Sequence, residues 1–356
     1  MKPPKFLVPS NSFFSELRKR INQHFVEIKS KPTGNIHLYI KAMILIVSFT
    51  GLYTHLVFFT SGYVFISLLE CMILGALTSA IGFNIMHDGA HGSFSKKMWL
   101  NELAGLSLNM FGANVFMWKT KHNVVHHTYT NIEGMDDDIN AKPFLRLCDT
   151  QKKYKIHRFQ HLYFWMVYSF LYLYWIFFTD YKKYFTQKVG DIPIKKMVLS
   201  DHLSFWAFKL THIILFIAIP IYMVGIIPWI IGFLTYALFT GFVLSLVFQL
   251  AHTVEDTHFP GVNMATGVLE DEWAVHQLKT TANFATTNKI VSWFTGGLNF
   301  QIEHHLFPHI SHIHYPAISA IVKQVCLEYD ITYIEFPKVR FAVASHILHL
   351  KQMGMQ

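Results

Sequence analysis

Four long apolar segments constrain this chain more than any other feature of its sequence. A bilayer-spanning helix needs about 20 predominantly apolar residues, and the segments that meet this requirement form two pairs: 40–59 with 63–85, and 206–227 with 229–250. Within each pair only a short turn separates the members, at Thr60-Ser61-Gly62 and at Pro228. Because 52% of the residues are hydrophobic and only 15% are charged, the composition is typical of a membrane protein. The sequence therefore predicts an all-α integral membrane fold with four transmembrane helices in two hairpins.

The basic residues are distributed unevenly around these segments. Residues 1–41 hold eight Lys and Arg against two acidic residues, residues 86–200 hold fifteen against nine, and neither hairpin tip holds any. By the positive-inside rule, the N-terminal segment 1–36, the middle segment 86–200 and the C-terminal segment 251–356 face the cytoplasm. The net charge of +8 in so apolar a chain indicates attraction to membrane lipid rather than to nucleic acid.

Two further segments have the character of interfacial helices. Residues 161–178 have the length and the lack of charge of a fifth span, but their many Tyr and Trp residues suit the membrane interface. A fifth crossing would also divide the histidine clusters described below between two compartments, so we expect this segment not to cross. Residues 100–118 are less apolar, with Asn101, Glu102, Asn109 and Asn114, and we expect them to lie at the interface as well.

Histidines gather in three clusters at or beyond the predicted span ends. The clusters are His87-Asp88-Gly89-Ala90-His91, His122-Asn123-Val124-Val125-His126-His127 and Gln301-Ile302-Glu303-His304-His305, and His252 follows the fourth span. A spacing of four residues places two imidazoles on one face of a helix. Imidazole suits iron, zinc, copper and nickel. A single such pair is often only an interfacial pair, but three clusters on one membrane face indicate a shared metal site.

The number of histidines also bears on the kind of site. Seven clustered histidines and His252 exceed the ligands that one ion such as zinc uses, so the sequence predicts two metal ions. A zinc protease is disfavoured, because its motif requires Glu directly after the first His, and here Asp88 follows His87.

The three clusters, in this order and spacing, resemble the three histidine boxes of the membrane fatty acid desaturase superfamily. The phrases His126-His127-Thr128-Tyr129-Thr130-Asn131 and Gly297-Leu298-Asn299-Phe300-Gln301-Ile302-Glu303-His304-His305-Leu306-Phe307-Pro308 are similar to its front-end, or linoleoyl-CoA desaturase-like, branch, which has Gln at the start of the third box. The resemblance begins near His37. It implies a single membrane desaturase domain over residues 1–356, in which four spans carry a cytoplasmic helical cap, built from 86–200 and 251–356, that holds two iron ions.

The resemblance also assigns roles to individual residues. It implies iron ligands at the box histidines and at the histidine after the fourth span, which are His87, His91, His122, His126, His127, His252, His304 and His305. Gln301 occupies a ligand position, but an amide is a weaker donor, so it binds iron through water or orients a neighbour.

Other residues near the boxes keep two interpretations. His276 is either a ligand or a partner that orients one. Asp136, Asp137 and Asp138 follow the second cluster, and we expect one of the three to orient a ligand imidazole, with Asp137 and Asp138 as the candidates. The alternative is that they lie in a solvated turn or helix cap. Trp118 either walls the substrate channel or packs at the interface.

The implied reaction is oxygen-dependent desaturation. Two Fe²⁺ ions and O₂ remove two hydrogens from adjacent carbons of an acyl-CoA or acyl-lipid, leaving a cis double bond between an existing one and the carboxyl end. The chain lacks the His-Pro-Gly-Gly motif of a fused cytochrome b5 domain, so an external ferredoxin or cytochrome b5 is the expected electron donor.

Two rival functions remain open at this stage. A hydroxylase of the same superfamily would use the same irons, although the phrase around Gln301 disfavours it. A histidine-rich metal transporter would hold its ligands near the bilayer midplane, whereas these clusters lie at or beyond the span ends.

Glu70 and a group of basic residues each allow two interpretations. Glu70, deep in the second span, either hydrogen-bonds to His55 across the hairpin or marks a polar spot near the substrate tunnel. The basic residues Lys119, Lys121, Lys152, Lys153, Lys155 and Arg158 attract either a phosphate-bearing headgroup or coenzyme A, or simply the membrane surface.

Overall fold

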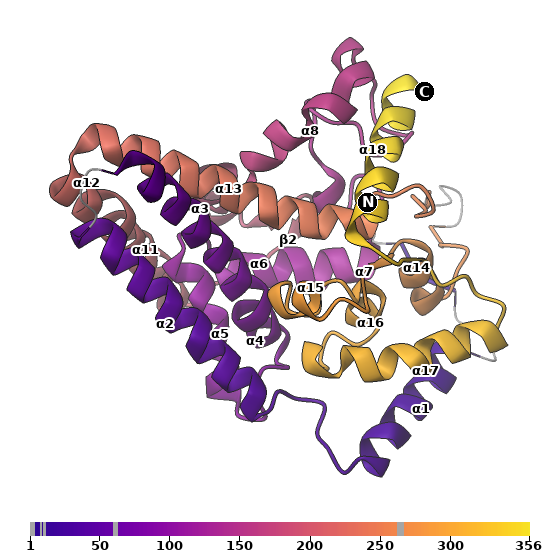
Figure 1. The fold of residues 1–356 in the computed structure, drawn as a ribbon. Helices are drawn as coiled ribbons and strands as arrows, with labels where there is room; N and C mark the ends of the chain where they lie inside the picture. The colour runs from indigo at the N-terminus through magenta and orange to yellow at the C-terminus, as the bar shows by residue number, and fades with distance from the viewer. Residues whose placement is uncertain (1–3, 8, 10–11, 60–62, 262–266) are drawn as a thin grey trace. The chain divides into compact units, whose positions relative to one another are not determined.

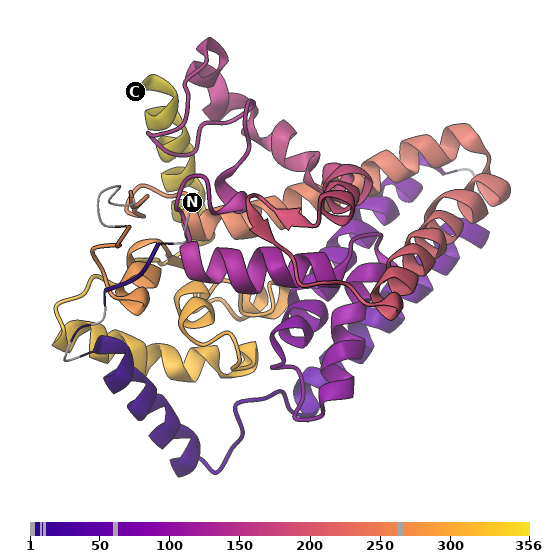
Figure 2. The ribbon, with the colours of Figure 1, turned by 180° about the vertical axis from the view of Figure 1, so that it is seen from behind.

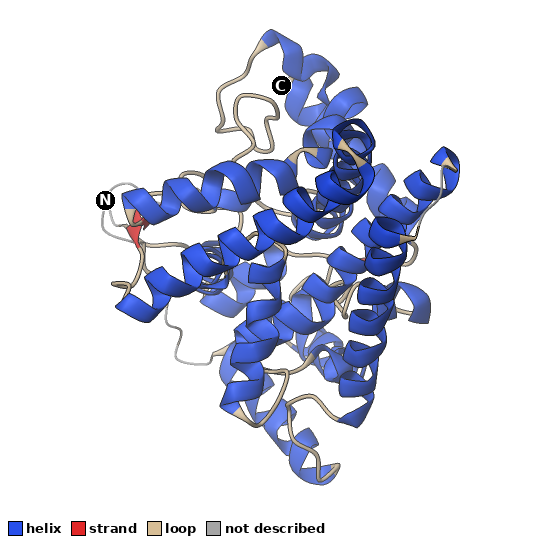
Figure 3. Cartoon of the chain, turned by 90° about the vertical axis from the view of Figure 1, so that its left-hand side faces the viewer, coloured by secondary structure: helices blue, strands red, loops and turns tan. Residues whose placement is uncertain are grey.

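A computed structural model describes residues 4–7, 9, 12–59, 63–261 and 267–356 of this chain as an all-α membrane fold (Figure 3). The predicted turn Thr60-Ser61-Gly62 lies outside these residues. The chain forms two compact units, which we call unit 1 (residues 1–33, 121–164 and 247–356) and unit 2 (residues 34–120 and 165–246). Among the described residues, the only strands are two residues long and form two two-stranded sheets.

Unit 2 contains most of the membrane-spanning residues. Its helices are α2 (Ile36–Phe58), α3 (Val64–Ile81), the π-helix η1 (Gly82–Met86), α4 (His87–His91), α5 (Met98–Met110), α6 (Val115–Lys119), α9 (Leu171–Tyr174), the π-helix η5 (Trp175–Thr179), α10 (Asp180–Thr186), α11 (Leu199–Ile213), the π-helix η6 (Ile214–Ala218), α12 (Ile219–Val224) and most of α13 (Ile226–His252). The antiparallel strands β1 (Lys188–Val189) and β2 (Ile192–Pro193) follow α10 (Figure 2).

Unit 1 contains the second and third histidine clusters. Its elements are α1 (Phe13–Glu27), the π-helix η2 (Thr120–His126), α7 (His127–Tyr129), the 3₁₀ helices η3 (Asp137–Ile139) and η4 (Lys155–Phe159), the start of α8 (Gln160–Ser169), α14 (Trp273–Lys279), β3 (Asn283–Phe284), α15 (Lys289–Phe294), α16 (Gln301–Leu306), the 3₁₀ helix η7 (His312–His314), α17 (Tyr315–Glu328), β4 (Glu335–Phe336) and α18 (Val339–Met355). Strands β3 and β4 pair in parallel.

Four helices match the predicted spans, but each extends beyond the predicted limits at one end or both, and the first three stop one to three residues short at the other end. Within the described residues, four helices are long and apolar enough to cross a membrane: Ile36–Phe58, Val64–His91, Leu199–Val224 and Ile226–His252. The second one continues past residue 85 through the π-helical turn η1, so the first histidine pair belongs to the same helix as the span. The predicted limits marked the apolar cores, because polar residues at a helix end interrupt hydropathy without ending the helix.

The second hairpin turns at Gly225 rather than at Pro228. Gly225 has φ +86°, a conformation that glycine adopts without strain, and it ends α12. Pro228 instead lies in the first turn of α13, where the missing N–H would have no partner within the helix.

Pro220 accounts for the π-helical turn in the third span. The π-helix η6 precedes Pro220, which has no N–H to donate to the carbonyl four residues earlier, that of Phe216. The indole Nε1 of Trp229, across the turn, donates to this carbonyl at 2.8 Å. The third and fourth spans are therefore tied together where the helical hydrogen bonding is broken.

The aromatic segment predicted at the interface is bent. The helices Lys155–Ser169 and Leu171–Thr186 meet at 54°, and the number of candidate spans rises from four to five only if this pair counts as one. The placement of this segment at the interface stays a prediction.

Two buried asparagines of unit 2 hydrogen-bond to the backbone of neighbouring loops. The amide of Asn101 accepts from Ser95 N at 2.8 Å and donates to Ser95 O at 2.7 Å, and the side chain of Asn109 accepts from Val115 N at 2.8 Å. These side chains therefore hold the loops at the two ends of α5. In the first hairpin, Nδ1 of His55 lies 2.9 Å from Oε1 of Glu70, which agrees with the first of the two interpretations of Glu70.

The core of unit 1 forms where α1 packs along α17 (Figure 1). Apolar residues of α1 recur every three to four positions, at Phe13, Leu17, Ile21 and Phe25, and this face is buried against α14, α16 and α17. The carboxylate of Glu272 accepts from the N–H groups of Phe13 and Phe14 at 3.1 and 3.0 Å, which satisfies the start of α1. This packing fixes α16, the helix that carries the third histidine cluster.

Candidate metal centre

The first histidine pair lies on α4 in unit 2. The rings of His87 and His91 are 4.7 Å apart between centroids, and the indole of Trp118 contacts both edge-on at 5.6 and 5.8 Å. Gly89, between them, lets α4 approach α5 closely, because a Cβ there would meet Gly105 N at 2.7 Å. Trp118 therefore packs against the first pair of predicted ligands.

The second cluster lies on a π-helical turn rather than on a regular α-helix. His122 and His126 belong to η2, a rare element that occurs often at functional sites. Their rings stack at 5.2 Å with an angle of 21° between planes, so the predicted common face is retained. His127, the first residue of α7, places its Nε2 3.2 Å from that of His122.

The third cluster is held by buried polar contacts behind it. In α16, the carboxylate of Glu303 accepts from Asn283 Nδ2 and from the Tyr333 hydroxyl, both at 2.7 Å, and burial raises the pKa of Glu303. Asn283 Oδ1 also accepts from Ile302 N at 2.9 Å. These contacts tie α16 to the β3–β4 sheet.

Three histidines from distant segments converge inside unit 1. The ring nitrogens of His126, His252 and His305 that could bind a metal lie within 4.8 Å of one another, and all three side chains are buried. The ring of His127 lies 4.5 Å from that of His305 and 4.6 Å from that of His304. A second group, formed by His122, His126 and Asp138, meets the same distance limit.

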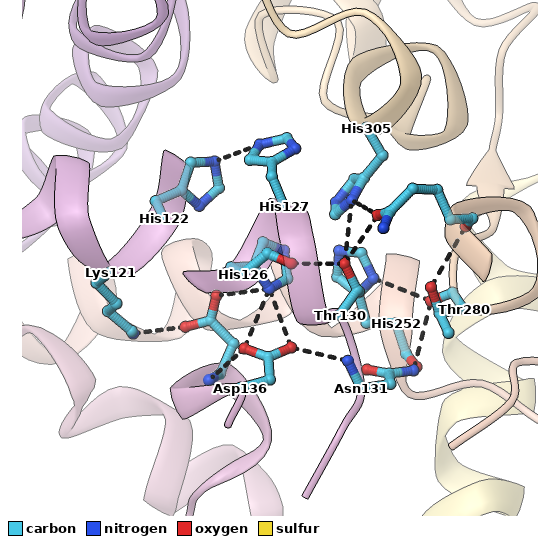
Figure 4. A network of polar contacts seen from close by, with 12 residues as sticks. Lys121, His122, His126, His127, Thr130, Asn131, Asp136, His252, Thr280 and His305 are labelled. Atoms are coloured by element: carbon cyan, nitrogen blue, oxygen red, sulfur yellow. Dashed lines mark hydrogen bonds and ion pairs between the residues drawn. The ribbon is translucent and has the colours of Figure 1, made fainter. Parts of the chain in front are cut away.

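Each member of the convergent triad has its Nδ1 beside an oxygen. Nδ1 of His126 lies 3.1 Å from the Asp136 carboxylate, Nδ1 of His252 lies 3.1 Å from the Thr280 carbonyl, and Nδ1 of His305 lies 2.8 Å from Oε1 of Gln277 (Figure 4). Metal-bound imidazoles nearly always donate their other N–H to such an acceptor. The pattern leaves Nε2 of each ring for a common ion.

The environment of His126 is charged. Burial disfavours a charged imidazole, but the carboxylates of Asp136 and Asp138 outweigh burial and raise the pKa of His126. Lys121 Nζ lies 2.5 Å from Asp138, and the pKa of Lys121 is also raised, because the nearby carboxylates overcome its desolvation. Asp136 further accepts from Asn131 N at 2.9 Å, which fixes the carboxylate against the ring (Figure 4).

If the triad of His126, His252 and His305 binds a metal ion, it should contain a buried nitrogen that the protein itself leaves without a partner. Nε2 of His252 is buried and has no hydrogen-bond partner among the described residues. An unsatisfied buried polar atom is costly, whereas a neutral imidazole nitrogen is the usual ligand for iron or zinc. The residues present therefore fit a metal site.

Comparison with known proteins identifies the kind of protein that carries this site. The sequence profile of the family described as fatty acid desaturase matches residues 61–337. The chain belongs to the fatty acid desaturase family. It is 37% identical to the sn-1 linoleoyl-lipid 6-desaturase of Arthrospira platensis, with 97% of this chain and 94% of that protein covered. It is 34% identical to the enzyme of the same name from Synechocystis sp. (95% and 94% covered) and 34% identical to the acyl-lipid (8-3)-desaturase of Physcomitrium patens (97% and 72%).

These relationships confirm several predictions made from the sequence. The protein is a front-end membrane desaturase, an oxidoreductase of lipid metabolism with a histidine-rich metal-binding cluster. This assignment agrees with the four apolar helices and with the convergence of histidines in unit 1.

In this desaturase, some of the uncertain residues lie at the site and others do not. Gln301 is buried at the start of α16, and its Nε2 has no hydrogen-bond partner among the described residues. His276 belongs to none of the metal-binding groups found among the described residues. Its ring lies edge-on to Phe6, and burial lowers its pKa to about 4. Asp138 lies 3.3 Å from Nδ1 of His126, whereas Asp137 opens η3.

Sequence reasoning did not single out several residues that orient the histidines. Asp136 was visible only as one of three consecutive aspartates. Gln277, Thr280 and Tyr315 carry no sequence signal, although the Tyr315 hydroxyl lies 3.1 Å from Nδ1 of His304. Thr130, inside the second-box phrase, donates to the Gln277 oxygen at 2.9 Å and so connects the second box to His305.

Proposed function

We propose that this desaturase inserts a cis double bond into the acyl chain of a membrane lipid, between an existing double bond and the carboxyl end. The names of its relatives from Arthrospira and Physcomitrium, which act on linoleoyl-lipid and acyl-lipid, support a lipid-linked substrate. The observation that carries the proposal is the triad of His126, His252 and His305, each with its Nδ1 beside an oxygen.

We propose that the metal is iron, at two ions per chain. When bound, the two Fe²⁺ ions would supply the reduction of O₂ that removal of hydrogen from an unactivated methylene requires. The triad and the neighbouring His122, His127 and His304 would hold the ions in unit 1. His87 and His91 join the proposed ligand set because they occupy the first histidine box of the family pattern.

Hydrogen-bond acceptors of the protein fix the tautomer and the orientation of these histidine ligands. Donation of the Nδ1 proton of His126 to Asp136 fixes the ring tautomer and makes the other nitrogen a stronger donor. The Thr280 carbonyl and the Gln277 amide oxygen act in the same way on His252 and His305. The chain would thus present preoriented Nε2 atoms, at little cost of reorganisation when metal binds.

The partners of the reaction follow from its chemistry. Forming one double bond with O₂ needs two electrons beyond those of the substrate, and we propose that an external ferredoxin or cytochrome b5 supplies them. The carrier of the acyl chain is a membrane lipid, as for the relatives, rather than coenzyme A.

Product analysis tests the reaction. We would express the desaturase with a ferredoxin and its reductase in a bacterial host supplied with linoleate, and analyse lipid acyl chains by gas chromatography with mass spectrometry. The expected product has one new cis double bond on the carboxyl side of the existing pair, and the His126→Ala variant should not form it. A hydroxylated chain as the main product would contradict the proposal.

Metal analysis tests the site separately. Protein purified without chelators should contain about two iron atoms per chain. One zinc and no iron in protein handled under anaerobic conditions would exclude the proposed centre.

We further propose that the histidine clusters face the cytoplasm and that residues 161–178 do not cross the membrane. Thr150→Cys and Ser200→Cys flank this segment, and the three native cysteines are buried. Both introduced thiols should react with an impermeant maleimide only from the cytoplasmic side. Labelling of the two positions from opposite sides would refute this topology.

A further inference from the structure

Unit 1 exposes a segment that combines basic and apolar side chains, residues 152–162, which we call the basic–apolar segment. Its cations are Lys152, Lys153, Lys155 and Arg158, all exposed. Between Thr150 and Thr179 the sequence has no acidic residue. The positive charge is therefore not balanced within the segment.

Large apolar side chains are exposed among these cations. Ile156 is 57% exposed, Phe159 53% and Leu162 63%, and Phe144, which precedes the segment in the chain, is 61% exposed. The guanidinium of Arg158 lies over the Phe159 ring at 6.0 Å, and Lys152 Nζ lies over the Tyr154 ring at 5.3 Å. Apolar groups beside cations in this way are typical of surfaces that lie in a lipid interface.

The other side of the segment is anchored within unit 1. His157 is buried, and its Nε2 lies 2.8 Å from the Pro143 carbonyl. Helix α18 packs directly on it, since a Cβ at Gly354 would meet the His157 carbonyl oxygen at 2.1 Å. Lys153 Nζ donates to the Met355 carbonyl at 2.5 Å. Because one side is held, the remaining cations and apolar side chains present a fixed outward surface.

We propose that this surface binds the headgroups of anionic membrane lipids, with Ile156 and Phe159 in the acyl boundary beneath them. Charge complementarity favours an anionic partner, because exposed cations follow one another without an intervening carboxylate. An acidic electron-transfer protein would satisfy the charge as well, but the exposed Ile, Phe and Leu side chains favour lipid. The inference does not depend on the proposed reaction.

Lipid quenching in nanodiscs tests this inference. A fluorophore on Phe159→Cys of the full-length protein would report contact with brominated phosphatidylglycerol (anionic) or brominated phosphatidylcholine (neutral). We expect half-maximal quenching at a lower mole fraction of the anionic lipid, and a weaker preference at high salt.

A charge-neutralised variant tests the cations directly. Lys152→Gln, Lys155→Gln and Arg158→Gln together should reduce the preference for anionic lipid at least tenfold, since each cation near a charged membrane contributes about a fivefold factor. The matched control, Arg18→Gln, Lys19→Gln and Lys31→Gln, removes the same charge from exposed positions 18, 19 and 31 and should keep the preference. Equal melting temperatures would show that both variants are folded.

Three outcomes would overturn the proposal. The label would escape quenching by either lipid if the surface faced water. Both lipids would quench equally, with no effect of the triple variant, if the contact were apolar only. Reduced ferredoxin would protect the label while brominated lipid did not quench it if the partner were an acidic protein.

Discussion

Unit 1 contains two sets of buried histidines that differ in what surrounds them. The first set is the triad of His126, His252 and His305, whose rings lie 4.7 to 4.9 Å from one another. The second is His346 and His349 on α18, which are buried to the same degree. Their neighbours are aromatic rings instead, Phe164 at 5.5 Å for His346 and Phe259 at 5.3 Å for His349.

The difference shows that burial and helical spacing do not by themselves make a metal ligand. His346 and His349 are three residues apart on one helix, and their ring nitrogens lie 2.7 and 2.8 Å from the carbonyls of Thr253 and Leu147. Neither belongs to a metal-binding group among the described residues. An Nδ1 beside an oxygen is common to the triad and to His346. The triad differs because its three rings arrive from separate segments and bring their remaining nitrogens together. Convergence of such rings is what distinguishes a ligand set from packing histidines.

The largest expected effect comes from removing one ring of the triad. His252→Ala should lower desaturase activity at least about 100-fold and reduce iron below two per chain, because a direct ligand contributes more than the roughly 10- to 100-fold of an orienting partner. Product yield and iron content would be measured together. The matched change in the second set, His349→Ala, should lower the melting temperature but leave the iron content unchanged, and loss of iron there would contradict the comparison.

The next largest effect concerns the carboxylate behind His126. Asp136→Asn keeps the size of the side chain and one acceptor oxygen but removes the negative charge that makes the imidazole of His126 a strong ligand. Activity should fall about 10- to 100-fold, with weaker retention of iron during dialysis against a chelator. Asp137→Asn, at the neighbouring position, is the control and should behave like wild type. Equal losses in both variants would mean that the turn itself, rather than Asp136, matters.

These residues also show how far the sequence alone could predict the site. The spans and the boxes were predictable, because apolar runs and histidine spacing are local patterns. The contact of Asp136, rather than Asp137, with His126 was not predictable, because it depends on how a single 3₁₀ turn orients consecutive side chains. Gln277 and Thr280 were also hidden, because only the tertiary fold brings α14 and its following loop to histidines on α13 and α16.

A smaller effect is expected at Gln301, which carries the front-end pattern. Gln301→Ala should lower activity about tenfold, a typical loss for a group that orients or supports a ligand. Gln301→His should restore an imidazole yet still impair turnover, because the ring is a stronger donor and bulkier than the amide. Iron content and product yield would be compared with those of His314→Ala, whose ring contacts the Thr33 carbonyl at 3.2 Å and whose loss should spare both. Wild-type behaviour of Gln301→Ala would make this residue a bystander.

The smallest effect on turnover is expected of His346, whose role should appear in the pH dependence of stability. Burial lowers the pKa of His346 to about 4, from an ordinary value near 6.5. Between these values the unfolded chain binds a proton that the folded protein does not. His346 therefore contributes stability that is fully present above pH 6.5 and is lost as the pH falls toward 4, by on the order of 3 kcal/mol.

The variant His346→Gln can still donate to the Thr253 carbonyl but does not titrate, so it should isolate this contribution. Melting temperatures in detergent would be recorded for both proteins from pH 7.5 to pH 4.5. Wild type should lose more stability than His346→Gln on acidification, although other buried histidines such as His276 act in the same direction in both proteins. Activity at pH 7.5 should be nearly equal, because His346 contacts Phe164 of α8 and Thr253, the residue after α13, but belongs to no metal-binding group among the described residues. Parallel pH profiles would show that the pKa of His346 is the same in the folded and the unfolded protein, which would contradict the lowering of this pKa by burial.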